Sequence, residues 1–118
     1  MDIKKVAAKE IRPLRNLVLR PNLPIETTFY DLDDNKGTFH LASIMDNTII
    51  SIGTFYPEND VQLQTKNAYR LRGMATHPNY RRKSAATKLM EKSFVLLKEK
   101  KCDILWCKAR LIAVEFYK

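Results

Sequence analysis

The sequence is poor in cysteine and histidine. Its 118 residues include two cysteines, Cys102 and Cys107, which lie five positions apart in or beside one apolar stretch. In a strand, residues five apart point to opposite faces, so a disulfide between them is not expected. The spacing is not that of a zinc knuckle, and only two histidines lie elsewhere. We expect two reduced thiols of the core type and no metal site.

Long apolar segments are also missing. No stretch approaches the length of a membrane span, and the N-terminus MDIKKVAAKEI has no signal-peptide core. We therefore expect a cytoplasmic protein without a membrane partner. The chain has no repeats, and its length fits one domain over residues 1–118 around one hydrophobic core.

Acidic residues are scarce relative to basic ones. The chain has 13 Asp and Glu against 21 Lys and Arg, which gives a net charge of +8. This excess fits nucleic acid, an acidic membrane surface or a small polyanionic ligand, or a basic protein that binds none of them. We expect no nucleic acid, because no stacking-aromatic motif or recognition-helix pattern is present. Several basic residues crowd one part of the chain: Arg70, Arg72, Arg81, Arg82, Lys83 and Lys88.

That part, residues 69–98, reads YRLRGMATHPNYRRKSAATKLMEKSFVLLK. An alternating run is followed by a short basic loop of small residues at 81–86, and a helical pattern then begins at once. Amides at the start of a helix have no intrahelical partner, and the helix dipole favours negative charge there. The segment therefore predicts a seat for a phosphate group.

Apolar periodicity predicts strands at 3–7, 38–45, 48–56, 68–76 and 103–108, with helices at 10–19, 84–100 and 111–118. Residues 25–37 read as a loop. The unit from 68 to 108 predicts two parallel strands joined by a helix, after an antiparallel meander. The fold class is therefore mixed α/β, or α+β, around one sheet. Gly73 inside a strand suggests a bulge; regular alternation would place Ala75 on the face of Tyr69, and Met74 on the opposite one.

Three blocks of this sequence resemble the GNAT superfamily of acyl-CoA-dependent N-acetyltransferases. They are LRGMATHPNYRRKSAATKLM at 71–90, LWCKARLIAVEFYK at 105–118, and the hairpin at 38–56. The family carries a strand, an Arg/Gln-x-x-Gly-x-Gly/Ala loop and then a helix. Arg81, Ser84 and Ala86 take the three marked positions, with Ser84 in place of a glycine.

The resemblance implies a GNAT-like, mostly antiparallel sheet and an acetyl-CoA co-substrate. It implies that the pantetheine arm lies along the backbone of Met74, Ala75 and Thr76, where two strands part. The pyrophosphate would bind the loop and helix start, formed by Arg81, Arg82, Lys83, Ser84, Ala85, Ala86 and Thr87. Tyr117 matches the family tyrosine that protonates the departing thiolate. The acceptor would be a primary amine.

Several alternatives stay open at this stage. Ser84 could be an ordinary helix cap, and Tyr117 could be a core aromatic. The general base is not defined among Glu26, Glu58 and Asp60. A non-catalytic GNAT-fold module that binds coenzyme A, or works only by association, is the alternative to the enzyme. Family members usually continue with two further strands, so we expect a C-terminally short domain whose open sheet edge favours a homodimer.

Overall fold

A computed structural model of the chain describes residues 1–59, 66–81, 83–107 and 112–115. The strands are β1 (Asp2–Val6), β2 (Phe39–Met45), β3 (Thr48–Pro57), β4 (Tyr69–Thr76), β5 (Ile104–Cys107) and β6 (Ile112–Glu115). The helices are α1 (Ala8–Leu19) and α2 (Ala85–Glu99), with short 3₁₀ turns η1 (Ile25–Thr28) and η3 (Pro78–Tyr80).

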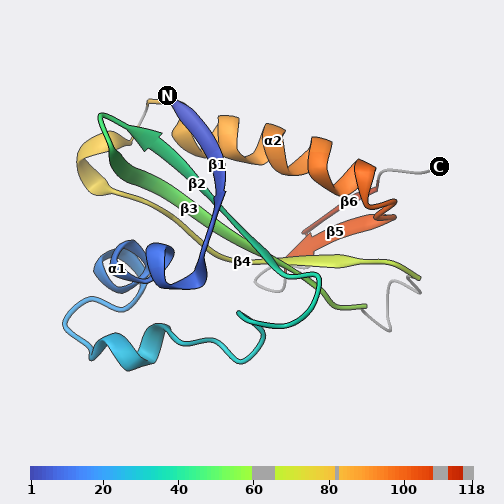
Figure 1. Cartoon of the computed structure of the whole chain (residues 1–118), viewed down its shortest axis with the longest axis horizontal. Coiled ribbons are helices and arrows are strands. Elements are labelled where there is room, and N and C mark those ends of the chain that lie inside the picture. The colour runs from blue at the N-terminus through green and yellow to red at the C-terminus, as the bar shows by residue number, and fades with distance from the viewer. Residues whose placement is uncertain (60–65, 82, 108–111, 116–118) are drawn as a thin grey trace.

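The strands form one sheet in the order β1-β2-β3-β4-β5-β6. Every neighbouring pair is antiparallel except β4 and β5, which are parallel and flank α2 in the sequence. Helices α1 and α2 cover opposite faces of the sheet (Figure 1). The predicted fold class, a mixed and mostly antiparallel sheet with one parallel strand-helix-strand unit, is confirmed.

Each face of the sheet has its own apolar cluster. On the α2 face, the buried members are Phe39, Leu41, Phe55, Tyr69, Leu89, Leu97, Cys102 and Leu105. On the α1 face, they are Ile11, Leu14, Ala42, Ile52 and Ala75. Cys102 is buried within the first cluster and Cys107 is half-buried, and both thiols are free.

Helix α1 begins at Ala8, two residues before the predicted start. The Glu10 carboxylate accepts a hydrogen bond of 2.6 Å from the Ala7 amide, which pairs one backbone donor that precedes the helix. Pro13 lies inside the helix.

The predicted bulge in β4 is confirmed at Gly73. Residue Ile52 pairs with Ala75 and Thr54 pairs with Arg72, so two residues of β4 oppose the single Gly53 of β3. Gly73 has φ +68°, a left-handed conformation that favours glycine. The extra residue shifts the alternation of side chains by one position.

The predicted faces of Met74 and Ala75 are therefore wrong. Met74 packs against the cluster on the α2 face, together with Leu71. Ala75 belongs to the cluster on the α1 face. A regular period of two assigns each to the opposite side, because it does not count the bulge.

The predicted C-terminal helix at 111–118 is also wrong where the structure describes it. Residues Ile112–Glu115 form β6, which pairs with β5 in antiparallel register. Two of its four residues, Ile112 and Val114, are β-branched and suit a strand. Pairing also satisfies backbone groups on the open side of β5, which a helix would leave without partners.

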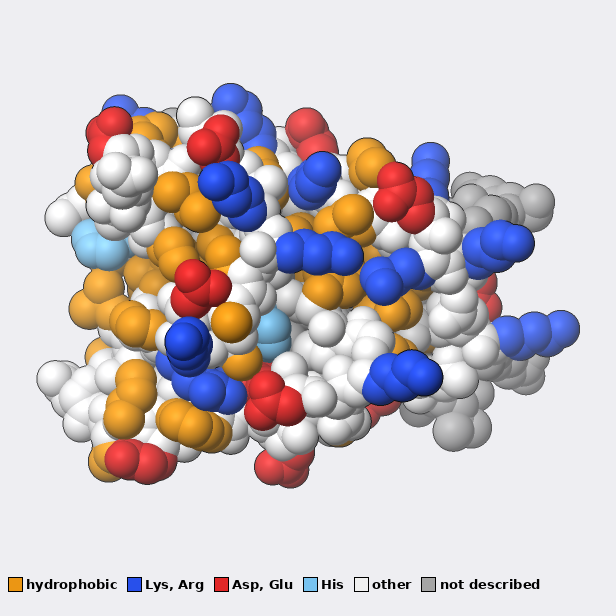
Figure 2. All heavy atoms as spheres, viewed as in Figure 1, with side chains coloured by type: hydrophobic (Ala, Val, Ile, Leu, Met, Phe, Trp, Pro, Cys, Tyr) orange, Lys and Arg blue, Asp and Glu red, His pale blue; other side chains and the backbone are white. Residues whose placement is uncertain are grey.

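On the face drawn in Figure 2, acidic and apolar side chains lie among the basic ones. Neither helix among the described residues is long and apolar enough to cross a lipid bilayer.

Candidate functional site

The start of α2 has an unusual backbone. Ser84 immediately precedes the helix with φ 62° and ψ 14°, and its side chain makes no capping hydrogen bond. Serine at the N-cap normally has an extended backbone and accepts a bond from the first turn. Ser84 therefore does not act as an ordinary cap, and it adopts the conformation that a glycine would favour.

The first amides of α2 have no partner within the helix. The first intrahelical bond runs from the amide of Lys88 to the carbonyl of Ser84, at 3.0 Å. The amides of Ala85, Ala86 and Thr87 precede that bond and have no acceptor within the helix itself. The first turn contains no acidic residue. These features together provide donors and a positive potential suited to an anion.

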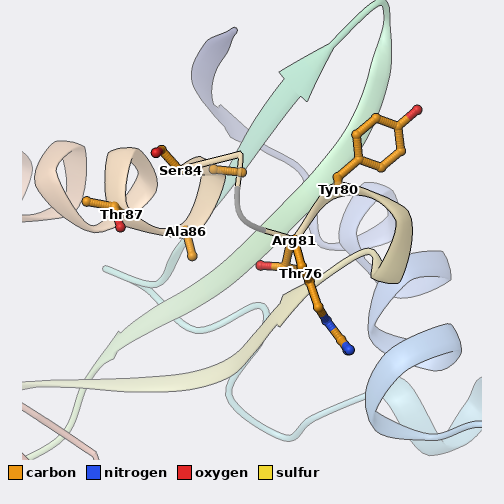
Figure 3. A pocket seen from close by; sticks show the side chains of 7 residues that line it. Thr76, Tyr80, Arg81, Ser84, Ala86 and Thr87 are labelled. Atoms are coloured by element: carbon orange, nitrogen blue, oxygen red, sulfur yellow. The ribbon is translucent and has the colours of Figure 1, made fainter.

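A cleft of about 280 Å³ lies at this helix start. Its lining comes from the end of β4, the turn η3 and the first turn of α2: Thr76, Tyr80, Arg81, Ser84, Ala85, Ala86 and Thr87. Figure 3 shows Ser84, Ala86 and Thr87 on the helix side, with Thr76 and Arg81 opposite them. The guanidinium end of Arg81 points away from α2 in this view.

Strand β4 parts from β5 next to this cleft. The parallel register between them covers Tyr69 with Leu105 and Arg70 with Trp106, and it ends there. Strand β4 continues to Thr76 and stays paired with β3 on its other side. Its final residues therefore have one edge without a strand partner among the described residues. Such an edge can accept an extended, amide-rich ligand by adding hydrogen bonds along the backbone.

Most of the residues predicted to bind the cofactor lie in or beside this cleft. Thr76, Arg81 and the four residues 84–87 line the cleft, and Lys83 is exposed beside it. Met74 contributes its side chain to the core, which leaves only its backbone for a ligand. The carbonyl of Ala75 accepts a bond of 3.2 Å from the Ser51 hydroxyl.

Two predicted residues, Arg82 and Tyr117, lie outside the described residues, as does Asp60. The other two acidic candidates for a base differ in their surroundings. Glu58 accepts a hydrogen bond of 2.9 Å from Arg70 and forms an ion pair with it. Glu26 lies exposed in η1.

Sequence reasoning missed a buried polar network on the α1 face. Arg15 is fully buried and donates to both carboxylate oxygens of Asp33, at 2.8 and 3.2 Å. It also donates to the Thr54 hydroxyl at 2.8 Å. The same hydroxyl lies 2.8 Å from Nδ1 of His40, whose Nε2 lies 3.1 Å from the carbonyl of Asp33.

The charges in this network are set by their neighbours. Burial alone would raise the pKa of Asp33, but the hydrogen bond and charge of Arg15 outweigh it and lower that pKa. Burial lowers the pKa of His40, which favours the neutral imidazole. One signal was available in the sequence, since Arg15 lies four positions after Ile11 and therefore on the buried face of α1.

The network reaches the bulge in β4. A Cβ at Gly73 would lie 3.2 Å from Nε of Arg15, so the glycine makes room for the guanidinium. The Arg15 guanidinium carbon lies 3.8 Å from the centroid of the Tyr30 ring, and that of Arg72 lies 4.3 Å from it. The loop before β2 is thereby fastened against β4 beside the point where the sheet opens.

Comparison with known proteins places this arrangement in a family. The sequence profile described as Acetyltransferase (GNAT) family matches residues 8–118. The chain is 36% identical over 110 residues to the uncharacterized N-acetyltransferase YitI of Bacillus subtilis (strain 168), covering 93% of this chain and 74% of that protein. The chain therefore belongs to the GNAT acetyltransferase family.

Solved structures share the fold. A GNAT family acetyltransferase from Brucella melitensis, solved in complex with acetyl-CoA, superposes with a TM-score of 0.77 at 18% identity, over 99% of this chain and 88% of that one. An aminoglycoside 6′-N-acetyltransferase from Acinetobacter haemolyticus superposes with a TM-score of 0.75 at 23% identity, over 94% and 81% of the two chains. At these identities the likeness establishes the fold.

Proposed function

We propose that this protein is an acetyl-CoA-dependent N-acetyltransferase that acts on a primary amine by direct attack in a ternary complex, with residues 1–118 as one domain. One observation carries the proposal. The start of α2, which the left-handed Ser84 precedes, lines a cleft next to the free edge of β4. The pyrophosphate of coenzyme A matches the anion-binding start of α2, and its pantetheine arm matches the free edge of β4.

The cleft would bind the pyrophosphate through the backbone amides of residues 85–87. Ser84 and Thr76, which both carry hydroxyl groups, line the same cleft. Arg81, Arg82 and Lys83 would add positive charge around it, since long basic side chains reach phosphate from an exposed loop. The backbone of Met74, Ala75 and Thr76 would pair with the pantetheine amides. The thioester would then lie near Gly73.

The reaction transfers an acetyl group from sulfur to nitrogen. The amine nitrogen attacks the thioester carbonyl, a C–N bond forms, and the C–S bond breaks. The amine loses a proton to a base or a water chain, and the departing thiolate gains one from an acid. A β4 amide near Met74 or Ala75 would stabilise the oxyanion, and Tyr117 is the candidate acid by resemblance.

Calorimetric titration with acetyl-CoA tests the cofactor half of this proposal. We expect saturable binding by the wild-type protein, and a loss of at least tenfold in affinity when Arg81 and Arg82 are both replaced by Glu. The matched control is Lys92→Glu with Lys88→Glu, two reversals further along the same helix, which should cost less because charge effects weaken away from the helix start. Absence of saturable binding by the wild type at millimolar cofactor would overturn the proposal.

A non-catalytic module that binds coenzyme A is the second candidate. It is favoured by one observation: Glu58, a candidate base, is already paired with Arg70. Acetyl transfer from acetyl-CoA to a panel of primary amines, followed by thiol release, separates the two functions. Turnover of any amine excludes the module, whereas cofactor binding without turnover across the panel supports it.

A further inference from the structure

Arg72 is an exposed arginine held in a fixed position on β4. Its guanidinium carbon lies 4.3 Å from the centroid of the half-buried Tyr30 ring. That ring is in turn in contact with the buried guanidinium of Arg15, at 3.8 Å. Stacking on an aromatic ring orients a guanidinium while its edge keeps several N–H donors available. Arg72 is therefore a preorganised donor rather than a freely moving surface charge.

No carboxylate within the described part of the chain pairs with Arg72. The preceding basic residue on the same face of β4, Arg70, forms an ion pair of 2.9 Å with Glu58. The buried carboxylate of Asp33 already forms an ion pair with Arg15 and a longer one with Arg12. Two arginines therefore lie two positions apart on one face of β4. Arg70 has a carboxylate partner, whereas Arg72 is exposed to solvent without one.

A buried hydroxyl lies beside this guanidinium. Tyr56 on β3 is 1% exposed. A hydrogen bond with its hydroxyl is the main cause that raises the pKa of Arg72. This contact fixes one side of the guanidinium further. A guanidinium has five N–H donors, so the exposed edge of Arg72 can still donate to a ligand with more than one acceptor oxygen.

The location of Arg72 assigns this ligand to the reaction. Arg72 directly precedes the bulge at Gly73, and the pairing of β4 with β5 ends two residues earlier. Thr76, at the phosphate end of the free edge, is four residues or roughly 13 Å away along the strand. If the proposed function holds, an extended pantetheine runs from Thr76 toward Gly73, and its thioester ends next to Arg72. Whatever Arg72 binds there is part of the acceptor.

We infer that the acceptor is a primary amine that also carries a carboxylate, and that Arg72 binds this carboxylate during acetyl transfer. The planar fork of a guanidinium matches the two oxygens of a carboxylate. The net charge of +8 favours the approach of such an acceptor and opposes that of a polycationic amine. The substrate class is therefore amino acids or peptides with an acidic group near the amine. This inference rests on the proposed function.

The test compares matched acceptors. Each amine is offered in two forms, as the free carboxylate and as the corresponding primary amide, for example an aspartyl dipeptide and its amide. We expect a kcat/KM at least tenfold higher for the carboxylate form. In Arg72→Met this preference should fall at least tenfold, because a charge-assisted hydrogen bond at a protein site is typically of that size. Arg72→Lys should keep part of it.

Lys92→Met is the matched control, since Lys92 is exposed on α2 and its replacement removes the same charge. It should leave the preference unchanged. Acetyl-CoA affinity and the thermal unfolding midpoint of Arg72→Met should stay near the wild-type values, which excludes loss of the cofactor site or of the fold as the cause.

A binding measurement separates this inference from the proposed function. Calorimetric titration of the CoA-loaded protein with the N-acetylated carboxylate product should show binding that Arg72→Met weakens at least tenfold. Turnover without a carboxylate preference, or with one that Arg72→Met leaves intact, overturns the carboxylate site and leaves the acetyltransferase standing. Arg72-dependent carboxylate binding without any turnover overturns the acetyltransferase and keeps the site. Neither binding nor turnover overturns both.

Discussion

The guanidinium of Arg15 donates to both carboxylate oxygens of Asp33, and neither side chain has any exposed surface. The pair joins the middle of α1 to the loop that precedes β2. Through Thr54 it is also bonded to β3. A buried ion pair adds little stability compared with an apolar replacement of both partners, but breaking it by removing one partner is costly.

Replacing Asp33 by Asn should strongly destabilise the protein. The neutral amide leaves the Arg15 charge buried without a counter-ion, which costs about 3–5 kcal/mol at such sites. Urea unfolding followed by circular dichroism measures the loss. The neighbouring Asp34 is exposed, so Asp34→Asn is the matched control and should change stability by less than about 0.5 kcal/mol. Equal effects of the two variants would contradict the prediction.

Stability should fall as the pH is lowered below about 6.5, the unfolded value for histidine. Burial lowers the pKa of His40 in the folded state. In the window between the two pKa values the unfolded chain binds more protons, so the free energy of unfolding decreases as pH falls. Asp33, whose pKa is also lowered, adds a further loss in the acidic range below about 3.9.

Urea unfolding at a series of pH values from 8 to 3 checks this dependence. His40→Gln cannot titrate, so it should remove the slope near pH 6 while keeping the loss at lower pH. A wild-type profile that is flat between pH 7 and 5 would show that His40 is not coupled to folding.

Gly73→Ala should destabilise the protein more than Gly53→Ala. An added Cβ meets a neighbour at 3.2 Å at both sites, Nε of Arg15 at Gly73 and the end of Leu89 at Gly53. Only Gly73 has a left-handed backbone, which costs a residue with a Cβ about 1–2 kcal/mol. The difference between the two variants in urea unfolding therefore measures the backbone term. Equal losses of stability in the two variants would mean that steric crowding by the added Cβ, and not the backbone conformation, causes the destabilisation.

Ser84→Gly should stabilise the protein by about 0.5–1 kcal/mol. Ser84 has a left-handed backbone without a compensating side-chain bond, and glycine removes that strain at some cost in unfolded-chain entropy. Ser84→Ala keeps the strain and should bring no gain. Acetyl-CoA titration of both variants adds a second readout. If Ser84→Gly and Ser84→Ala lose the same amount of affinity relative to the wild type, the serine hydroxyl itself donates to the ligand.

The cleft at the start of α2 lies where the sequence predicts a phosphate site, because the features behind that prediction are local in sequence. Strand, basic loop and helix start follow one another within residues 69–98, and each is defined by neighbouring residues. Of the residues 81–87 predicted to bind the pyrophosphate, Arg81 and the four residues 84–87 line this cleft. The left-handed backbone of Ser84 was less accessible, because serine before a helix normally predicts a cap.

The buried network was not predictable because its members are far apart in the chain. Arg15, Asp33, His40 and Thr54 lie on four different segments, and each alone resembles a surface residue. Only the folded sheet brings them together. The strand β6 was missed for a related reason: the short Ile112–Glu115 segment is decided by its pairing with β5 rather than by its own pattern.

The extra residue at Gly73 decides the course of β4. It lets one strand send Leu71 and Met74 toward α2 and then Ala75 toward α1. Deleting Gly73 would leave a regular alternation in which Leu71 and Met74 still face α2 and Ala75 still faces α1, but it would remove the local bend and the stronger twist that a bulge gives a strand. We therefore expect the deletion to keep both apolar clusters and to redirect the end of β4, where its pairing with β5 has ceased.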